Sequence, residues 1–240
     1  MNIYMGKITG IDDALDSLFM SKRTWTPKLH IDIVEACEKN TDRFGRYCPS
    51  EDKESLDFFN KEVGLLFKWG EKHYTMLRFI DFSCIVEGLH RGAQDDFDSH
   101  AKRLDNRIIR SSTRLADFGN EKSDYYDGKI ITMDEALSII EIKAPGEIIM
   151  DGKKYVKCVN GYILEEYKDN KDVKRGLYML SIPSNFIFKC QLTEWAHIYK
   201  ERYEKSNANP ELKDMVERVT ETLHTMFPWI TKKLLLDIKN

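Results

Sequence analysis

The chain has 240 residues, enough for one large domain or two small ones, and 42% hydrophobic and 32% charged residues are typical of a globular protein. A net charge of −3 excludes a global basic field that would attract nucleic acid or a membrane surface, so any anion site must be local. The five cysteines are widely spread without C-x-x-C or zinc spacing, which favours a reduced protein. Because neither a signal sequence nor a membrane-spanning apolar run is present, we expect a cytoplasmic protein with no membrane partner.

The first hundred residues predict three helices and one strand. The spacing of apolar residues predicts a short helix over 11–20 and an amphipathic helix over 53–70, where Gly70 marks the end. Residues 75–86 are rich in aromatic and β-branched side chains and predict a strand. Apolar residues at spacings of three and four then predict a helix over 87–104.

The rest of the chain predicts a meander between helices. The sequence T-M-D-E at 132–135 is a capping box that opens a short helix. Asp-Gly and Asn-Gly pairs between apolar runs predict a three-stranded meander over 147–167. We expect one helix over 186–205 and another that begins at Asn-Pro, residues 209–210, and ends before Pro228.

These elements define the expected architecture. No repeat, low-complexity stretch or Pro/Gly-rich linker divides the chain, so we expect a single domain over residues 1–240 with an enlarged β-meander segment at about 120–180. The predicted fold class is α/β of the α+β type, with a central, mostly antiparallel sheet, flanking helices and a helical C-terminal third. A doubly wound nucleotide fold is not expected, because strands and helices do not alternate strictly and no Gly-rich turn follows a strand.

The stretch RIIRSSTR at 107–114 is the clearest local concentration of positive charge. In a helix Arg107, Arg110 and Arg114 would share one face, with Ser111 beside them. In a loop the hydroxyls and backbone N–H groups would converge instead. Either arrangement could hold a phosphate, since guanidinium groups match phosphate oxygens and hydroxyls add neutral donors. The alternative is a solvated basic face.

Three further residues stand out by their positions. Arg202 follows Trp195 and its apolar neighbours at helical spacing, so it either pairs with a carboxylate, lines a polar pocket for an anion, or packs its stem while its head reaches water. His100 lies in an apolar stripe, where most histidines are hydrogen-bonded core residues. His73 lies just past a helix end, where imidazole can complement the last carbonyl groups.

The sequence offers neither a protein nucleophile nor a metal site. It contains no G-x-S-x-G, no cysteine beside a histidine, no H-E-x-x-H and no Walker loop. If the protein is an enzyme, we therefore expect an organic cofactor to perform the difficult step.

Four pieces of the sequence, in this order, resemble the flavin-dependent thymidylate synthase family. They are H-Y-T-M-L-R-F at 73–79, similar to H-x-[ST]-x-[FL]-E-H; S-H-A at 99–101, at the place of the R-H-R signature; S-T-R at 112–114, similar to S-x-R; and Arg202 with A-N-P-E-L at 208–212, similar to L-R followed by A-Q-x-E-I. The resemblance covers roughly residues 60–118 and 180–228.

The resemblance implies an FAD-dependent transferase that alkylates C5 of a dUMP-type pyrimidine nucleotide, with dUMP to dTMP as the default reaction. Methylenetetrahydrofolate would be the carbon donor and NADPH the reductant, in a homotetramer with active sites shared between subunits. The implied nucleotide-binding residues are Arg107, Arg110, Ser111, Ser112, Arg114 and Arg202, of which Arg202 and Ser112 are the implied catalytic pair. The implied FAD contacts are His73, Thr75, Ser99 and His100, with Gln191, His197 and Asn209 as further flavin candidates.

The signature is also eroded. Ser99 and Ala101 stand where the family has arginines, and Arg78 replaces a glutamate. These departures leave two alternatives open. One is a catalytically impaired relative that binds nucleotide or flavin and has a regulatory or assembly role. The other is a nucleic-acid-binding protein that uses the basic strip 102–114, although the overall acidic balance argues against it.

Overall fold

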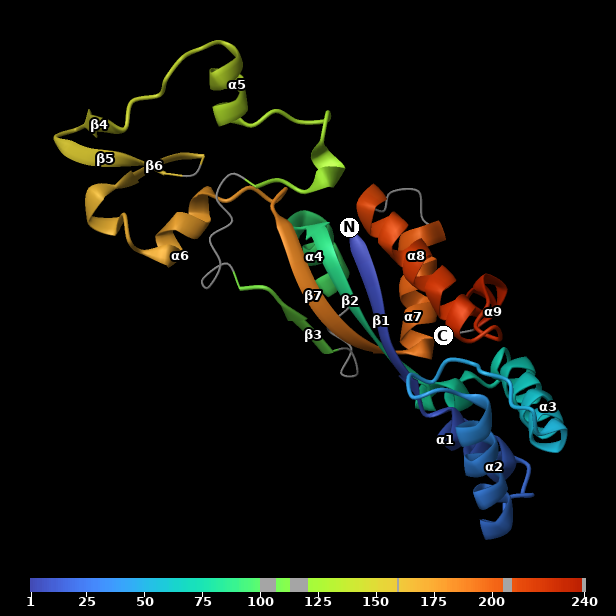
Figure 1. Ribbon diagram of the computed structural model, residues 1–240. Coiled ribbons are helices and arrows are strands. Elements are labelled where there is room, and N and C mark those ends of the chain that lie inside the picture. Colours follow the sequence, from blue (N-terminus) through green and yellow to red (C-terminus); the bar gives the residue numbers. More distant parts are fainter. Residues whose placement is uncertain (100–106, 113–120, 159, 205–208, 239–240) are drawn as a thin grey trace.

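The computed structural model describes residues 1–99, 107–112, 121–158, 160–204 and 209–238. A four-stranded sheet at its centre has the order β1-β2-β7-β3, and every neighbouring pair is antiparallel (Figure 1). Its strands are β1 (Asn2–Thr9), β2 (Asp81–His90), β7 (Pro183–Gln191) and β3 (Arg107–Arg110). A separate antiparallel sheet has the order β4-β5-β6. The predicted class, antiparallel sheets with flanking helices, is confirmed.

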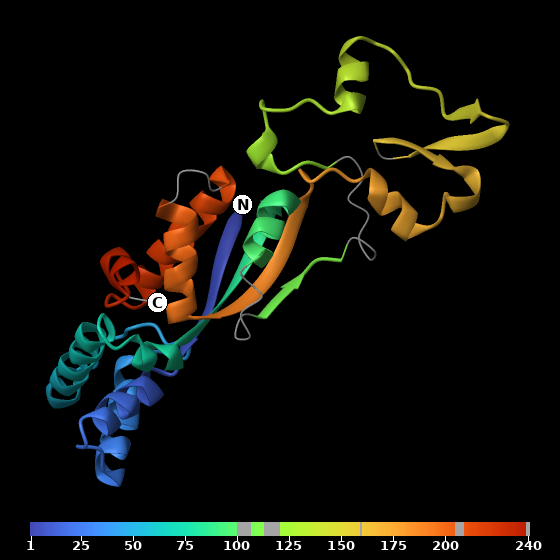
Figure 2. The ribbon, with the colours of Figure 1, turned by 180° about the vertical axis from the view of Figure 1, so that it is seen from behind.

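The central sheet buries one face under helices. The side chains on that face are almost fully buried: Phe82, Cys84, Val86, Phe186, Phe188 and Cys190. Phe97 of α4 (Arg91–Asp98) and Trp195 of α7 (Leu192–Tyr199) both lie within 6 Å of the Phe188 ring, at 5.0 and 5.8 Å between centroids. Figures 1 and 2 show α4 and α7 on the same side of the sheet, together with α8 (Pro210–Met226).

The N-terminal region contains two elements that the sequence pattern did not predict, β1 and α2 (Pro27–Asn40). The predicted helices are present as α1 (Ile11–Ser21) and α3 (Lys53–Gly70). Gly10 connects β1 to α1 with a φ of 80°, and a Cβ there would lie 1.9 Å from the Phe79 carbonyl oxygen. Only glycine fits this junction.

The boundaries predicted between residues 75 and 104 are wrong. Residues Tyr74–Phe79 form a 3-10 turn, η1, and the strand begins only at Asp81. The strand also continues past residue 86, through a register shift between Val86 and Leu89, to His90. Helix α4 therefore begins at Arg91 and ends at Asp98, and the remainder of the predicted helix, residues 100–104, lies outside the described residues. Pairing with β1 and β7 overrides the helical spacing of residues 87–90.

Residues 124–180, here called the arm, extend away from one end of the central sheet (Figures 1 and 2). The predicted capping box opens α5 (Met133–Ile139), with hydrogen bonds between Thr132 and Glu135 of 2.6 and 3.3 Å. The predicted meander is β4 (Glu147–Met150), β5 (Lys153–Cys158) and β6 (Gly161–Leu164), followed by α6 (Lys171–Lys174). Asp151 and Gly152 both have positive φ, as a two-residue turn of type I′ requires.

The single helix predicted over 186–205 is wrong, because its first residues form β7. Side chains along residues 184–190 alternate strictly between buried and exposed, which is the period of a strand. Helix α7 follows and widens into a π-helical turn, η6, at Lys200–Glu204. Helix α8 begins after the predicted Asn209 cap and ends at Met226, before Pro228, and α9 (Lys232–Asp237) closes the chain.

The hydrophobic core joins the central sheet to α1–α4 and α7–α9 in one cluster. The arm stands apart from it, since Ile163 is the only buried apolar residue among those described in the arm. No helix within the described ranges is long and apolar enough to cross a membrane.

Candidate functional site

Two predicted site residues meet at the C-terminal end of α4. The Arg202 guanidinium donates a hydrogen bond of 2.8 Å to the Ser99 hydroxyl and one of 2.9 Å to the Asp96 carbonyl oxygen. The Ser99 hydroxyl also donates to that carbonyl, at 2.7 Å. A cation is favourable here because the last carbonyl groups of a helix carry partial negative charge. Arg202 comes from η6, so the π-helical turn brings this guanidinium to the end of a helix more than a hundred residues earlier.

Arg110, at the end of β3, also reaches α4, but its guanidinium is held there by carboxylates. Its guanidinium is 2.9 Å from Asp95 and 2.5 Å from Asp98, and the second oxygen of Asp98 is buried without a hydrogen-bond partner among the described residues. Burial raises the pKa of Asp98 and the charge of Asp95 raises it further, whereas the charge of Arg110 lowers it. A phosphate at Arg110 would have to compete with both carboxylates.

The described part of the stretch RIIRSSTR, residues 107–112, forms neither the helix nor the free loop considered above. Its first four residues form the edge strand β3, whose Arg110 pairs with Phe186 of β7. Ser111 is fixed by its backbone N–H and its hydroxyl, which donate to the Asn185 carbonyl oxygen at 2.8 and 3.0 Å. Ser112 is exposed and follows directly. Arg107 pairs with Lys189 through its backbone. Arg114, His100 and most of the basic strip 102–114 lie outside the described residues.

Three predicted flavin residues lie at the end of the sheet where β2 begins and β7 ends. His73 and Thr75 are exposed at the start of η1, and the His73 ring stacks on Trp69 at 5.8 Å. Gln191 ends β7 opposite Asp81. Because β7 spans nine residues, Gln191 lies about 26 Å from Pro183 at the other end of the strand. The predicted cofactor residues therefore form two groups.

Asn209 and His197 have positions of their own. Asn209 caps α8, and its side-chain oxygen accepts from the N–H groups of Glu211 and Leu212 at 3.0 and 3.4 Å. Its amide nitrogen lies 3.3 Å from the His90 ring. His197 is a half-buried residue of α7. Asn209 thus serves a structural purpose that is sufficient to explain it.

A buried polar cluster around His90 and Glu211 was missed by the sequence analysis. The His90 ring contacts the Glu211 carboxylate, which also accepts from the His90 backbone N–H at 3.0 Å and from the Ser123 hydroxyl at 3.1 Å. Tyr125 and Tyr126 pack on the imidazole at 5.6 and 4.9 Å. Burial raises the pKa of Glu211, but the hydrogen bonds from His90 and Ser123 and the His90 charge outweigh it and hold the pKa below its usual value.

This cluster joins the arm to the core. Ser123 immediately precedes the arm, His90 ends β2, and Glu211 lies in the first turn of α8. The only sequence signal was a glutamate two residues after the Asn209 cap, and such a residue is usually a solvated partner of the helix N-terminus. Nothing in the local pattern of residues 88–91 indicates that His90 faces it.

The thiol groups that can be assessed are poor nucleophiles. Burial raises the pKa of Cys84 and Cys37 to about 12, with nearby acidic residues contributing at Cys37, and burial raises that of Cys190 as well. These three thiols stay protonated at neutral pH. Within the described ranges, no cluster of three or more His, Cys, Asp or Glu side chains could hold a metal ion.

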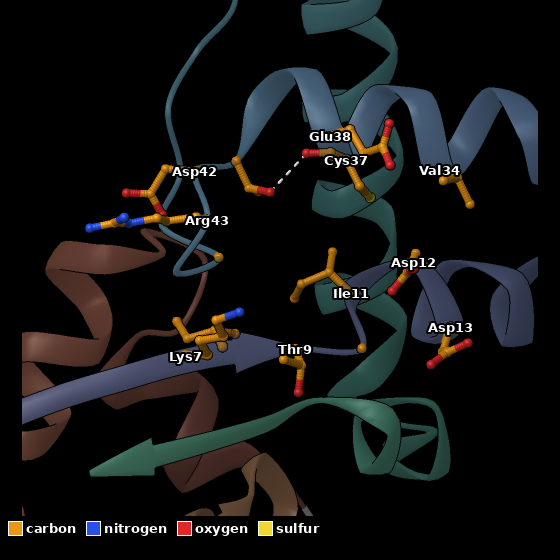
Figure 3. A pocket seen from close by; sticks show the side chains of 14 residues that line it. Lys7, Thr9, Ile11, Asp12, Asp13, Val34, Cys37, Glu38, Asp42 and Arg43 are labelled. Atoms are coloured by element: carbon orange, nitrogen blue, oxygen red, sulfur yellow. Dashed lines mark hydrogen bonds between the residues drawn. The ribbon is translucent and has the colours of Figure 1, made fainter. Parts of the chain in front are cut away.

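A cavity of about 580 Å³ lies elsewhere, where β1 leads into α1 and faces α2 (Figure 3). Its lining is mixed in charge, with Asp12, Asp13 and Glu38 on one side and Lys7 and Arg43 on the other. It contains none of the predicted site residues. We therefore place the candidate site at the end of α4 and not in this cavity.

Comparison with solved structures identifies the class of fold. The chain has the fold of the flavin-dependent thymidylate synthases. Two similar structures are both thymidylate synthase X (ThyX) from Helicobacter pylori with FAD and dUMP. The first has a TM-score of 0.57 at 12% identity and covers 98% of this chain and 100% of that one. The second has a TM-score of 0.55 at 13% identity and covers both chains completely. No family model and no curated protein matches the sequence.

Proposed function

We propose that this chain is an FAD-dependent transferase that alkylates C5 of a dUMP-type nucleotide with a folate-borne one-carbon unit, with dUMP to dTMP as the default reaction. Methylenetetrahydrofolate would supply the carbon and NADPH the electrons, in the cytoplasm. The observation that carries the proposal is the meeting of Arg202 with Ser99 at the end of α4, in a chain whose whole length follows a fold solved with FAD and dUMP.

The donors at this site suit an anionic or carbonyl acceptor. A guanidinium presents five N–H donors in a planar fork, so Arg202 can keep its bond to Asp96 and still turn donors toward a ligand. There it would hold the uracil carbonyl edge and stabilise negative charge that develops on the oxygen. Ser112 and Arg114 would bind the phosphate, and Ser111, fixed by Asn185, would position that loop. Arg110 contributes only if the ligand displaces Asp95 or Asp98.

FAD would supply the hydride, and the chain's residues would bind and orient it. At one end of the sheet the exposed His73–Trp69 stack offers flat aromatic surface beside the Thr75 hydroxyl. Asn209 lies beside His90, where β2 ends, and Ser99 lies at the end of α4. Gln191 and His197 remain further candidates, and His100 lies outside the described residues. Residues at both ends can surround one ligand if copies of the chain complete each other's sites. This separation supports a homotetramer with shared active sites.

The test is the visible absorption spectrum of the purified protein with added FAD, before and after dUMP. We expect bound oxidised flavin whose bands shift on addition of dUMP, followed by NADPH oxidation that requires both ligands. Arg202→Lys keeps the charge but not the fork, so it should weaken the dUMP-induced shift by about tenfold or more. Arg218→Lys, in α8, where the arginine donates to the Met1 carbonyl oxygen, is the matched control and should leave the shift unchanged. A chain that takes up neither ligand would rule the proposal out.

A second function, that of a catalytically impaired nucleotide- or flavin-binding relative, is favoured by one observation. Asp95 and Asp98 neutralise Arg110, the residue that was expected to reinforce phosphate binding. Such a protein would have a regulatory or assembly role. Ligand binding without any NADPH oxidation in the presence of the folate donor would favour this function over the first.

A further inference from the structure

An exposed aromatic stack lies where α1, α3 and η1 come together. Trp69, in the last turn of α3, is 40% exposed, and the His73 ring stacks on it with 26° between the ring planes. The Lys22 ammonium group, at the C-terminal cap of α1, lies over the Trp69 ring at 5.6 Å from its centroid. Residues at the ends of three elements therefore meet at one indole ring that is partly open to solvent.

The turn that His73 begins carries a second cation. The Arg78 guanidinium, near the end of η1, lies over the ring of Tyr74 at 5.2 Å, and Tyr74 directly follows His73 in the chain. Arg78 also stands where the family that the sequence resembles has a glutamate. The charge at this position is therefore reversed, and it is positive in a chain with an acidic balance.

The cations in this region keep their charge. A cation above an aromatic ring is attracted by the ring but is not neutralised by it, whereas a cation beside a carboxylate is. Neither Lys22 nor Arg78 forms an ion pair with a described residue. The same holds for Lys68 and Lys72, which are exposed on either side of the indole in the sequence. Glu71 is the only carboxylate between positions 68 and 78 of the sequence.

A flat ring with unpaired cations around it suits a flat ligand that carries phosphate. Aromatic side chains stack on nucleotide bases, and ammonium and guanidinium groups bind phosphate oxygens. Of the ligands of the proposed function, FAD and NADPH fit this description best, because both contain an adenosine diphosphate moiety, in which a flat base is joined to a pyrophosphate. In the proposed function dUMP binds elsewhere, at Arg202.

We propose that the adenosine diphosphate moiety of a dinucleotide binds at Lys22, Trp69, His73 and Arg78, here called the Trp69 site. The base would lie against the Trp69–His73 stack, and Lys22 and Arg78 would bind the phosphates. This inference rests on the proposed function, which supplies FAD and NADPH as the two dinucleotides. Trp69, Lys22 and Arg78 are then positioning residues, because they hold the part of the ligand that does not react.

The stack is tested by equilibrium dialysis of the full-length protein with ADP, FAD and NADPH, each measured separately. Trp69→Ala should weaken the binding of ADP, and of at least one dinucleotide, by about tenfold, because the base loses its stacking partner. Trp69→Phe keeps a flat ring and should recover most of the affinity. Recovery by phenylalanine distinguishes stacking from a loss of folding.

The cations are tested by the dependence of ADP binding on salt. Lys22→Gln and Arg78→Gln should each weaken ADP binding by about threefold and make it less sensitive to added salt, because fewer charges hold the phosphates. Lys153→Gln is the matched control, since Lys153 is an exposed lysine of β5 that forms no ion pair with a described residue. It should leave both the affinity and its salt dependence unchanged.

The two dinucleotides identify which ligand uses the Trp69 site. A loss confined to FAD in Trp69→Ala identifies FAD, and a loss confined to NADPH identifies NADPH. If the wild type binds FAD and dUMP but Trp69→Ala binds ADP, FAD and NADPH as tightly as the wild type, the Trp69 site is overturned and the proposed function stands. If the wild type binds neither FAD nor dUMP, the proposed function is overturned, and ADP binding that depends on Trp69 would still support the site.

Discussion

Arg202 and Arg110 show how the setting of an arginine decides what it can bind. Arg202 bonds a carbonyl and a hydroxyl, which are both neutral acceptors. Arg110 forms ion pairs with two carboxylates, which neutralise its positive charge. A cluster of arginines in a sequence therefore does not by itself predict an anion site, because nearby carboxylates can neutralise it.

Glu211 is the residue whose replacement should show the clearest pH dependence. Its pKa is held below the usual value in the folded chain, so its contribution to stability is present above the unfolded-state pKa and is lost as pH falls through the folded-state pKa. Glu211→Gln should lower the free energy of unfolding by about 2–4 kcal/mol at pH 7, because it removes a buried charge partner of His90.

Urea unfolding of both proteins at pH 7 and near pH 3.5 measures this effect. The difference should shrink as the pH falls, because a glutamic acid resembles glutamine once it is protonated, and the unfolded chain takes up that proton first. An equal difference at both pH values would contradict the assigned role. Glu217→Gln, in the same helix but bonded to Lys232 at the surface, is the control.

For individual residues, the sequence indicated a candidate such as Arg202 but not the side chains that such a residue contacts. Arg202 was singled out because of its apolar neighbours, and the structure brings it to Ser99. The His90–Glu211 contact was not predictable, since the two residues are 121 positions apart and neither interrupts a local pattern. Pairing of distant residues is decided by topology, which residue spacing does not encode.

Among the elements, those with an end signal were predicted best. The capping box of α5, the cap and proline of α8 and the Asp-Gly turn of the meander all appear where expected. The helix predicted over 186–205 failed because Phe186 and Cys190 also satisfy helical spacing, while the alternation of a strand extends over only a few residues. Pairing with β2 and β3 decides between the two periods.

Variants of Asn209, which caps α8, can distinguish a structural role of this residue from a role in ligand binding. Asn209→Ala should lower the free energy of unfolding by about 1 kcal/mol, because two backbone N–H groups lose their acceptor. Asn209→Ser keeps a capping oxygen but has no amide, so its stability should stay close to that of the wild type.

Thermal and urea unfolding of both variants, with FAD titrations alongside, check this. If Asn209 only caps the helix, FAD binding of Asn209→Ser is unchanged. If the amide contacts flavin, the serine variant binds FAD more weakly although it remains folded. A stable alanine variant would contradict the capping role.

In the whole molecule, stability is distributed unevenly between core and arm. The core buries its apolar residues in one cluster, whereas the described arm exposes many large apolar side chains: Ile131, Met133, Ile139, Ile140, Ile142, Ile149, Met150, Tyr167, Val173 and Leu180. Regions with few buried contacts open at low free-energy cost. We expect limited trypsin digestion to cut at arm residues such as Lys143 and Lys168 before it cuts within α3, α7 or α8, as read by mass spectrometry. Early cuts in α7 or α8 would contradict this.

The two roots of the arm lie side by side. The Ser123 N–H donates to the Ser181 carbonyl oxygen at 2.8 Å. The backbone N–H groups of Arg91 and Gly92 donate to the carbonyl oxygens of Ile182 and Leu180, each at 3.0 Å. The chain therefore enters the arm and leaves it at neighbouring points. A short turn between Ser123 and Ser181 could replace the arm without parting any described strand of the central sheet, so the arm is a module that could be exchanged for another segment.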